Sequence, residues 1–153
     1  MKSSSLFSKR TFRLMAGAWL ACVLGGCSTF ERDWKNAIAT PSPANNPQGA
    51  WQGAWLSDVN KHTGSLRCLL TPIDGHNYRA RFRATYAKVI RVSYAVQLQA
   101  EASPTNTAFH GSANLGWIAG GVYEYAGLAT ATNFFSTYRC KYDHGTFQMT
   151  RPK

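Results

Sequence analysis

The sequence predicts an all-β domain, a single antiparallel up-and-down barrel of about eight strands spanning residues 49–153. Three observations lead to this expectation. Apolar and polar residues alternate in the clearest segments, turn-forming residues recur between them, and no long window shows helical periodicity. Short strands joined by short turns favour a meander that closes on itself, because closure removes exposed strand edges. A β-sandwich is the alternative arrangement of the same strands.

Residues 1–26 have the pattern of an export signal. The start is basic, without acidic residues, and contains Lys2, Lys9, Arg10 and Arg13. An apolar run follows at 14–24, and it is too short for a confident spanning helix, which needs about 20 apolar residues. We therefore expect this segment to be removed on export.

The end of that signal, Leu24-Gly25-Gly26-Cys27, resembles the lipobox of bacterial lipoproteins. The resemblance implies cleavage before Cys27 and acylation of its thiol and new amino group, by chains such as palmitate. Several chains anchor stably, because each buried methylene contributes about 0.8 kcal/mol. Ser28, in place of an Asp, implies by the same resemblance an outer-membrane protein facing the periplasm. An ordinary secretory signal with a chance cysteine is the alternative.

Residues 27–48 are expected to be a lipidated tether. Phe30, Trp34 and Ile38 recur at i, i+4 and i+8, which predicts a short helix over 30–38. Prolines 41, 43 and 47 then interrupt regular structure. The tether therefore precedes the first strand without forming part of the barrel.

The expected strands end at turn-forming residues. Asp74-Gly75 and Asp143-His144-Gly145 are hairpin signals, and residues 103–106 form a turn cluster. These breaks predict strands at residues 50–57, 64–73, 77–87, 89–101, 106–114, 121–130, 133–142 and 145–151. Alternation in the third strand puts Tyr78 and Phe82 on an inner face, and the outer face carries Arg79, Arg81 and Arg83.

Two Gly-x-Trp units open the first strand, Gly49-Ala50-Trp51 and Gly53-Ala54-Trp55, and Arg151 ends the last strand. In these features the chain resembles the calycin superfamily, which includes lipocalins and avidins. There an arginine of the last strand packs across the first-strand tryptophan. The resemblance implies a barrel closed by a cation–π contact of Trp51 or Trp55 with Arg151. Other motifs of the superfamily are not visible, and the mature chain is short for a lipocalin.

Cys68 and Cys140 remain after lipidation of Cys27, and an even number in an oxidising compartment favours a disulfide. A closed barrel opposes it, because three strand steps of about 4.8 Å separate the two strands by roughly 14 Å. A disulfide needs Cα atoms within about 7 Å. A closed barrel therefore predicts free thiols, whereas a sandwich accommodates the bridge. No residue spacing indicates a metal site or a cofactor.

Aromatic residues are dense, and they either fill the core or line a cavity for a small lipophilic or amphipathic ligand. The candidate cavity residues are Tyr78, Phe82, Tyr94, Glu124, Tyr138 and Phe147. Glu124 is an interior carboxylate if it faces inward with Val122 and Leu128, and faces solvent if the register is shifted. The glycine-rich segment 116–121 is either a lid or a connection with a buried tryptophan.

Net charge bears on partners. Four of the seventeen basic residues belong to the leader, which leaves thirteen against seven acidic residues and lowers the net charge from +10 to +6. Arg79, Arg81 and Arg83 either form a face for an anionic envelope partner or only solubilise the strand. We expect no nucleic-acid partner for an exported protein.

The sequence shows no nucleophile elbow, phosphate loop, paired carboxylates or metal-binding histidines. We therefore expect a non-catalytic envelope lipoprotein that binds a small lipophilic or amphipathic ligand inside its barrel. The alternative is an interaction lipoprotein with a filled core, whose basic face contacts an envelope polymer or a protein.

Overall fold

The computed structural model describes residues 29–41 and 46–153. The predicted signal and Cys27 lie outside these residues. The described residues divide into two units, with the boundary between Asn36 and Ala37. Residues 29–39 are helical, which confirms the short helix, and the rings of Phe30 and Trp34 stack 6.0 Å apart. In the described segments, no helix has the length and apolar character needed to cross a bilayer.

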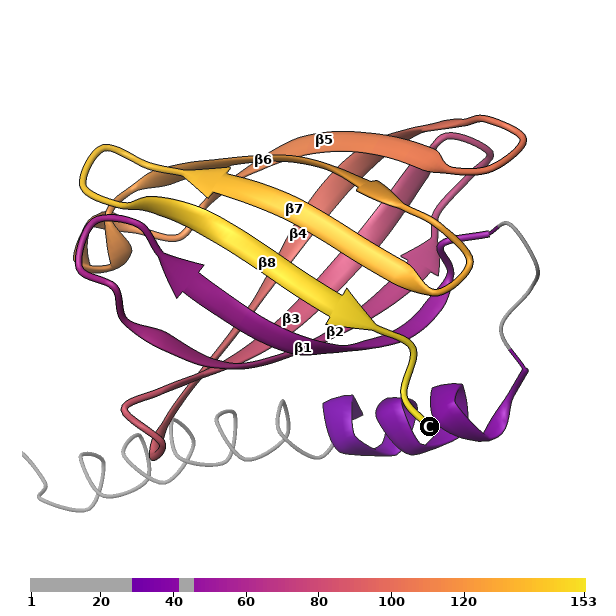
Figure 1. Cartoon of the computed structure of the whole chain (residues 1–153), viewed down its shortest axis with the longest axis horizontal. Coiled ribbons are helices and arrows are strands. Elements are labelled where there is room, and N and C mark those ends of the chain that lie inside the picture. Colours follow the sequence, from indigo (N-terminus) through magenta and orange to yellow (C-terminus); the bar gives the residue numbers. More distant parts are fainter. Residues whose placement is uncertain (1–28, 42–45) are drawn as a thin grey trace, which may run out of the picture. The chain divides into compact units, whose positions relative to one another are not determined.

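Eight antiparallel strands form a closed barrel in sequence order (Figure 1), which confirms the predicted fold class. Each strand pairs with the next, and the last pairs with the first, with Ser57 opposite Gly145. The strands are β1 (Gly49–Ser57), β2 (Thr63–Pro72), β3 (Asn77–Tyr86), β4 (Ile90–Ala102), β5 (Thr107–Asn114), β6 (Val122–Ala129), β7 (Asn133–Arg139) and β8 (His144–Thr150). A short 3₁₀ helix, η1 (Trp117–Ala119), lies between β5 and β6.

Local turn chemistry explains where the strands end. Asp74 Oδ1 accepts the backbone N–H groups of His76 and Asn77 at 2.9 and 2.8 Å, and these bonds hold the pKa of Asp74 below its usual value. The predicted extension of the seventh strand to residue 142 is wrong. Cys140 N donates to Asp143 O at 2.7 Å in a tight turn, and Tyr142 is exposed there.

The up-and-down order gives the barrel two different ends. The β1–β2, β3–β4, β5–β6 and β7–β8 loops surround one end, the mouth, at the left of Figure 1. The other three loops, the start of β1 and the end of β8 surround the opposite, closed end. Large apolar side chains from the strands fill the interior toward the closed end, including Trp51, Leu70, Leu98, Phe109, Phe134 and Met149.

The barrel is complete in itself. Every strand ladder lies within residues 49–150, and every residue of the main core lies within 51–149. Inward and outward positions alternate, as Ala80 and Phe82 show on β3. A chain that carries residues 46–153 therefore retains all the pairing and core packing described for the barrel.

Candidate functional site

The closed end is sealed by Trp51 and Arg151. The Arg151 guanidinium lies 3.7 Å from the centroid of the Trp51 ring. Its Nη atoms donate to the carbonyl oxygens of Asn46 and Gln48, each at 2.8 Å, and Trp51 Nε1 donates to Pro47 O at 2.8 Å. Burial lowers the pKa of Arg151 to about 10, so it stays cationic at neutral pH. These contacts tie the end of β8 to the segment that leads into β1.

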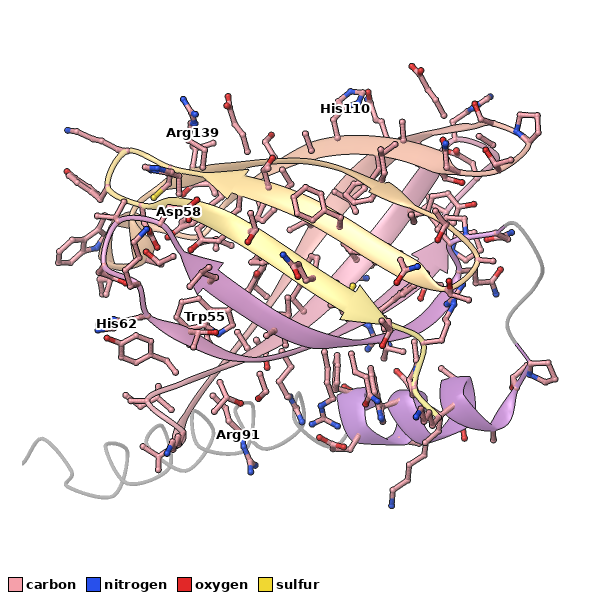
Figure 2. All side chains as sticks on the ribbon, in the orientation of Figure 1. Trp55, Asp58, His62, Arg91, His110 and Arg139 are labelled. Carbon is pink, nitrogen blue, oxygen red and sulfur yellow. The ribbon has the colours of Figure 1, made fainter. Side chains whose placement is uncertain are left out.

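Trp55 does not take part in this seal, so the alternative match of Gly53-Ala54-Trp55 to the closure motif is wrong. Trp55 lies four residues further along β1, at the mouth (Figure 2), where its ring stacks on Tyr86 with centroids 6.0 Å apart. Its Nε1 donates to Thr85 O at 3.0 Å. Gly64, its cross-strand partner, makes room for this ring, because a Cβ there would lie 2.7 Å from Trp55 Nε1.

A cavity of about 260 Å³ opens at the mouth, and we call it the mouth cup. It is lined by the rings of Trp55, Tyr86 and Phe147 and by polar groups of Tyr123, Tyr138 and Asp143. Its lining is Trp55, Asn60, Ala84, Tyr86, Val92, Tyr94, Leu115, Ala119, Tyr123, Tyr138, Asp143 and Phe147.

Asp143 lines the mouth cup and is held there by hydrogen bonds. Its Oδ1 accepts the Ser57 hydroxyl at 2.6 Å, and its Oδ2 accepts the Tyr138 hydroxyl at 3.1 Å. Ser57 is fully buried at the end of β1, and its Oγ also accepts Asn60 N–H at 3.3 Å. This network fixes the carboxylate at the wall of the cavity, where it supplies the negative charge.

Four tyrosines of the mouth resist ionisation, chiefly because they are buried. Burial, and then interaction with Tyr125, raises the pKa of Tyr94, and burial also raises that of Tyr125. Burial followed by the hydrogen bond to Cys140 raises the pKa of Tyr123. Burial followed by the charge of Asp143 raises that of Tyr138. The hydroxyls are therefore neutral at physiological pH.

The floor of the cup is filled by rings. Phe82 packs against Tyr94, Phe147 and Tyr125 with centroid separations of 5.2, 5.5 and 6.2 Å. Below them, the void beside Leu70 and Phe109 measures only about 10 Å³. A ligand can therefore enter the upper part of the barrel and cannot pass through it.

The predicted cavity residues separate into three groups. Tyr94, Tyr138 and Phe147 line the mouth cup, and Phe82 forms its floor. Tyr78 is instead at the closed end, where its hydroxyl donates to Asn46 Oδ1 at 3.5 Å, so its assignment to the cavity is wrong. Glu124 is also wrongly assigned, because the β6 register turns Tyr123 and Tyr125 inward and exposes Glu124.

The predicted basic face lies on β3, where Arg79, Arg81 and Arg83 alternate with the inward Ala80 and Phe82, and Arg79 is exposed. Arg83 stands between Arg67 and Ser93 in the register, and its Nε donates to Ser93 Oγ at 3.4 Å. Docking of an anionic partner on these three arginines stays a prediction.

Cys68 and Cys140 are free thiols in this structure. Cys68 is fully buried on β2, and burial raises its pKa. Cys140 lies just beyond β7, beside the Tyr123 hydroxyl. Across residues 29–41 and 46–153, no group of three or more His, Cys, Asp or Glu side chains is arranged to hold a metal ion.

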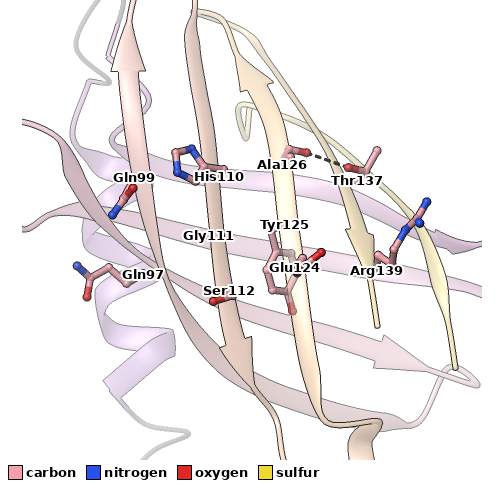
Figure 3. Close-up of a pocket in the computed structure, with 10 residues that line it drawn as sticks. All are labelled: Gln97, Gln99, His110, Gly111, Ser112, Glu124, Tyr125, Ala126, Thr137 and Arg139. Carbon is pink, nitrogen blue, oxygen red and sulfur yellow. Dashed lines mark hydrogen bonds between the residues drawn. The ribbon is translucent and has the colours of Figure 1, made fainter. Parts of the chain in front are cut away.

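A second, larger hollow of about 650 Å³ lies on the outer surface over β4–β7 (Figure 3). Polar side chains line it, including Gln97, Gln99, His110, Glu124 and Arg139. Thr137 Oγ1 donates to Ala126 O at 3.2 Å on this face. Its lining is more polar than that of the mouth cup, so the mouth cup is the better candidate for small-molecule binding.

Searches against protein families, curated proteins and solved structures found no match to this chain. The site is therefore defined by its own geometry.

The candidate cavity residues chosen from sequence omit Ser57, Tyr86, Tyr123 and Asp143. Three of them carried a usable signal: Ser57 continues the inward parity of Trp51 and Trp55, Tyr86 shares a face of β3 with Phe82, and Tyr123 shares parity with Tyr125. Asp143 carried none, since its position depends on how the β7–β8 turn folds back toward β1.

Proposed function

We propose that this chain is a lipid-anchored, non-catalytic envelope protein that binds one end of a small amphipathic ligand in the mouth cup. The observation that supports this proposal is that aromatic rings and a hydrogen-bonded carboxylate line the same cavity. The ring faces stabilise an apolar group by burial and stacking. Asp143 and the tyrosine hydroxyls select a polar group that can donate hydrogen bonds.

The size of the cup limits the ligand. Its volume of about 260 Å³ is below the range of about 300–1,000 Å³ typical of drug-sized ligands. The filled floor adds no depth. The ligand is therefore either a small ring compound or a longer molecule that inserts only its tip.

The test uses the neutral fluorophore phenylnaphthylamine and the exported chain of residues 28–153, which contains the whole barrel. We expect saturable fluorescence enhancement. Trp55→Ala removes a ring wall and is expected to weaken binding about tenfold. Phe135→Ala removes an exposed ring from the outer face of β7 and is the matched control, with an expected change of less than about twofold.

Two results would overturn binding in the cup: no saturable enhancement, or equal weakening by both substitutions. Native mass spectrometry of the same chain, purified from the periplasm, then examines the natural ligand. A bound mass that disappears on denaturation, and that Trp55→Ala removes, supports the proposal.

The lipid anchor has its own test. In cells fed labelled palmitate, the full chain is expected to incorporate the label and to fractionate with the outer membrane. Cys27→Ser is expected to abolish labelling, and Cys22→Ser is the matched control that leaves it unchanged. Labelling that survives Cys27→Ser would contradict the anchor.

A further inference from the structure

Most of the exposed large apolar side chains in the described segments gather at the mouth end. They lie on the tips of all four mouth loops or on the adjoining strand ends. The members are Leu56, Val59, Tyr86, Val89, Ile90, Val92, Trp117, Ile118, Val122 and Tyr142, and we call them the mouth rim. The closed-end loops carry Ile73 as their exposed large apolar residue. Such an accumulation at one end indicates an interaction surface.

The most exposed part of the mouth rim is held outward by its backbone. Trp117 and Ile118 are 88% and 84% exposed on η1. Gly116, Gly120 and Gly121 flank them with φ of 85°, 100° and 85°, a conformation that favours glycine. Gly121 N donates to Gly116 O at 2.9 Å, which closes the loop at its base. The tryptophan is thus presented to a partner and is not a buried plug.

Basic residues border these apolar tips. Lys88 precedes Val89 and Arg91 follows Ile90 on the β3–β4 hairpin. On the β7–β8 turn, Lys141 Nζ lies 5.2 Å from the centroid of the Tyr142 ring. In the part of the chain that the structure describes, Lys88 and Arg91 form no ion pair. Asp143, the acidic residue of the β7–β8 turn, is bound by Ser57 and Tyr138.

We propose that the mouth rim docks on a bilayer surface that contains anionic phospholipid. Trp, Tyr and branched aliphatic tips suit the interfacial region, and adjacent Lys and Arg suit anionic headgroups. The tips project from four separate loops, and a fluid lipid surface accommodates such tips without a complementary shape. A protein partner or a second copy would need that complementarity. The inference does not depend on occupancy of the mouth cup, although docking would place the cup opening against the lipid.

The test measures co-sedimentation of the exported chain of residues 28–153 with vesicles, so that no lipid anchor contributes. One vesicle contains phosphatidylcholine alone, and the other also contains phosphatidylglycerol. We expect binding to the anionic vesicle that weakens as salt rises. Lys88→Gln with Arg91→Gln is expected to weaken it about 25-fold, since each basic residue near the surface contributes about fivefold.

Substitutions at the opposite end are the matched controls. Ile118→Ser is expected to weaken vesicle binding about tenfold, whereas Ile73→Ser changes it less than about twofold. The pair Arg79→Gln with Lys153→Gln removes the same charge from the closed end and is also expected to change binding less than about twofold.

Several results would overturn the proposal. They are absence of wild-type binding, binding insensitive to phosphatidylglycerol, and equal losses for substitutions at the two ends. Concentration-dependent self-association that Ile118→Ser abolishes, without vesicle binding, would assign the mouth rim to a second copy and overturn lipid docking. Phenylnaphthylamine binding by the same variants separates this outcome from a failure of the mouth cup.

Discussion

The two ends of the barrel are built on the same local unit. Gly49-Ala50-Trp51 and Gly53-Ala54-Trp55 follow one another on β1 with the same parity, about 13 Å apart at about 3.3 Å per residue. Trp51 is fully buried beneath Arg151, whereas Trp55 is half-buried against Tyr86. One tryptophan seals the barrel and the other forms a wall of a cavity. The residue that packs on each tryptophan, Arg151 on Trp51 and Tyr86 on Trp55, distinguishes the two roles.

The two ends also differ in how their polar groups are hydrogen-bonded. At the closed end, the Arg151 guanidinium donates hydrogen bonds to the carbonyl oxygens of Asn46 and Gln48. At the mouth, Asp143 is held by Ser57 and Tyr138 at the wall of an open cavity. The contacts of the closed end therefore stabilise the fold, whereas the Asp143 carboxylate at the mouth can still accept a hydrogen bond from a ligand.

The largest expected effect breaks the closed end. Trp51→Ala removes a fully buried ring and the surface on which Arg151 lies, and it is expected to cost about 3–5 kcal/mol of unfolding free energy. Trp55→Ala, the matched change at the mouth, is expected to cost about 1–2 kcal/mol because its ring is only partly buried. Urea unfolding measures both. Equal losses would contradict the division of roles between the two units.

A smaller effect is expected from Gly64→Ala at the mouth. The added Cβ would lie 1.8 Å from Thr85 O and 2.7 Å from Trp55 Nε1, so β3 and the Trp55 ring must both shift. We expect a loss of about 2–3 kcal/mol and weaker phenylnaphthylamine binding. Gly75→Ala is the control, since nothing lies within 4 Å of its Cβ. A neutral Gly64→Ala would show that the Trp55 wall is not fixed by this contact.

Alkaline pH is expected to lower the free energy of unfolding, through the buried tyrosines near the mouth and through Cys68. The pKa values of Tyr94 and Tyr125 are raised in the folded protein above the ordinary value of 10.0. The unfolded chain therefore loses these protons first, and stability present below about pH 10 falls as pH rises, by at most about 1.4 kcal/mol per pH unit for each group. The raised pKa of Cys68 acts in the same direction from its ordinary value of 9.0.

Arg151, at the closed end, changes the free energy of unfolding in the opposite direction as pH rises. Its pKa is lowered to about 10, so the folded state releases this proton before the unfolded state, and its contribution to stability rises above about pH 10. Urea unfolding is expected to show a lower free energy of unfolding at about pH 11 than at about pH 8. Tyr94→Phe is expected to reduce that loss, and an unchanged loss would remove Tyr94 from the explanation.

The fold was predictable from sequence because its signals are local. Period-two alternation in β3 and β4 and the Asp74-Gly75 turn placed these elements close to their observed bounds. On β6 the alternation leaves two choices of inward face, because residues of both parities are apolar or aromatic. The register of β6 with β5 and β7 fixes the choice and puts Glu124 opposite Arg139 on the outer surface.

The site was less predictable, because it depends on which barrel end each residue reaches. Tyr78 and Tyr86 share one face of β3 but lie eight residues apart, so one meets the closed end and the other the mouth. The contact of Ser57 with Asp143 joins residues 86 positions apart. It follows from barrel closure between β1 and β8, which no local pattern encodes.

The smallest expected effect tests that last contact. Ser57→Ala removes the hydroxyl that donates to Asp143 Oδ1 and accepts Asn60 N–H. We expect a loss of about 1 kcal/mol, because Asp143 keeps the Tyr138 hydroxyl and partial access to water. Thr130→Ala is the control, since its hydroxyl makes comparable turn contacts at the closed end.

Ligand binding separates the two variants. Ser57→Ala frees an Asp143 lone pair in the mouth cup and changes the affinity for hydrogen-bond donors, whereas Thr130→Ala leaves that affinity unchanged. Identical binding by both variants would mean that the orientation of Asp143 is set by Tyr138 and the β7–β8 turn without help from Ser57.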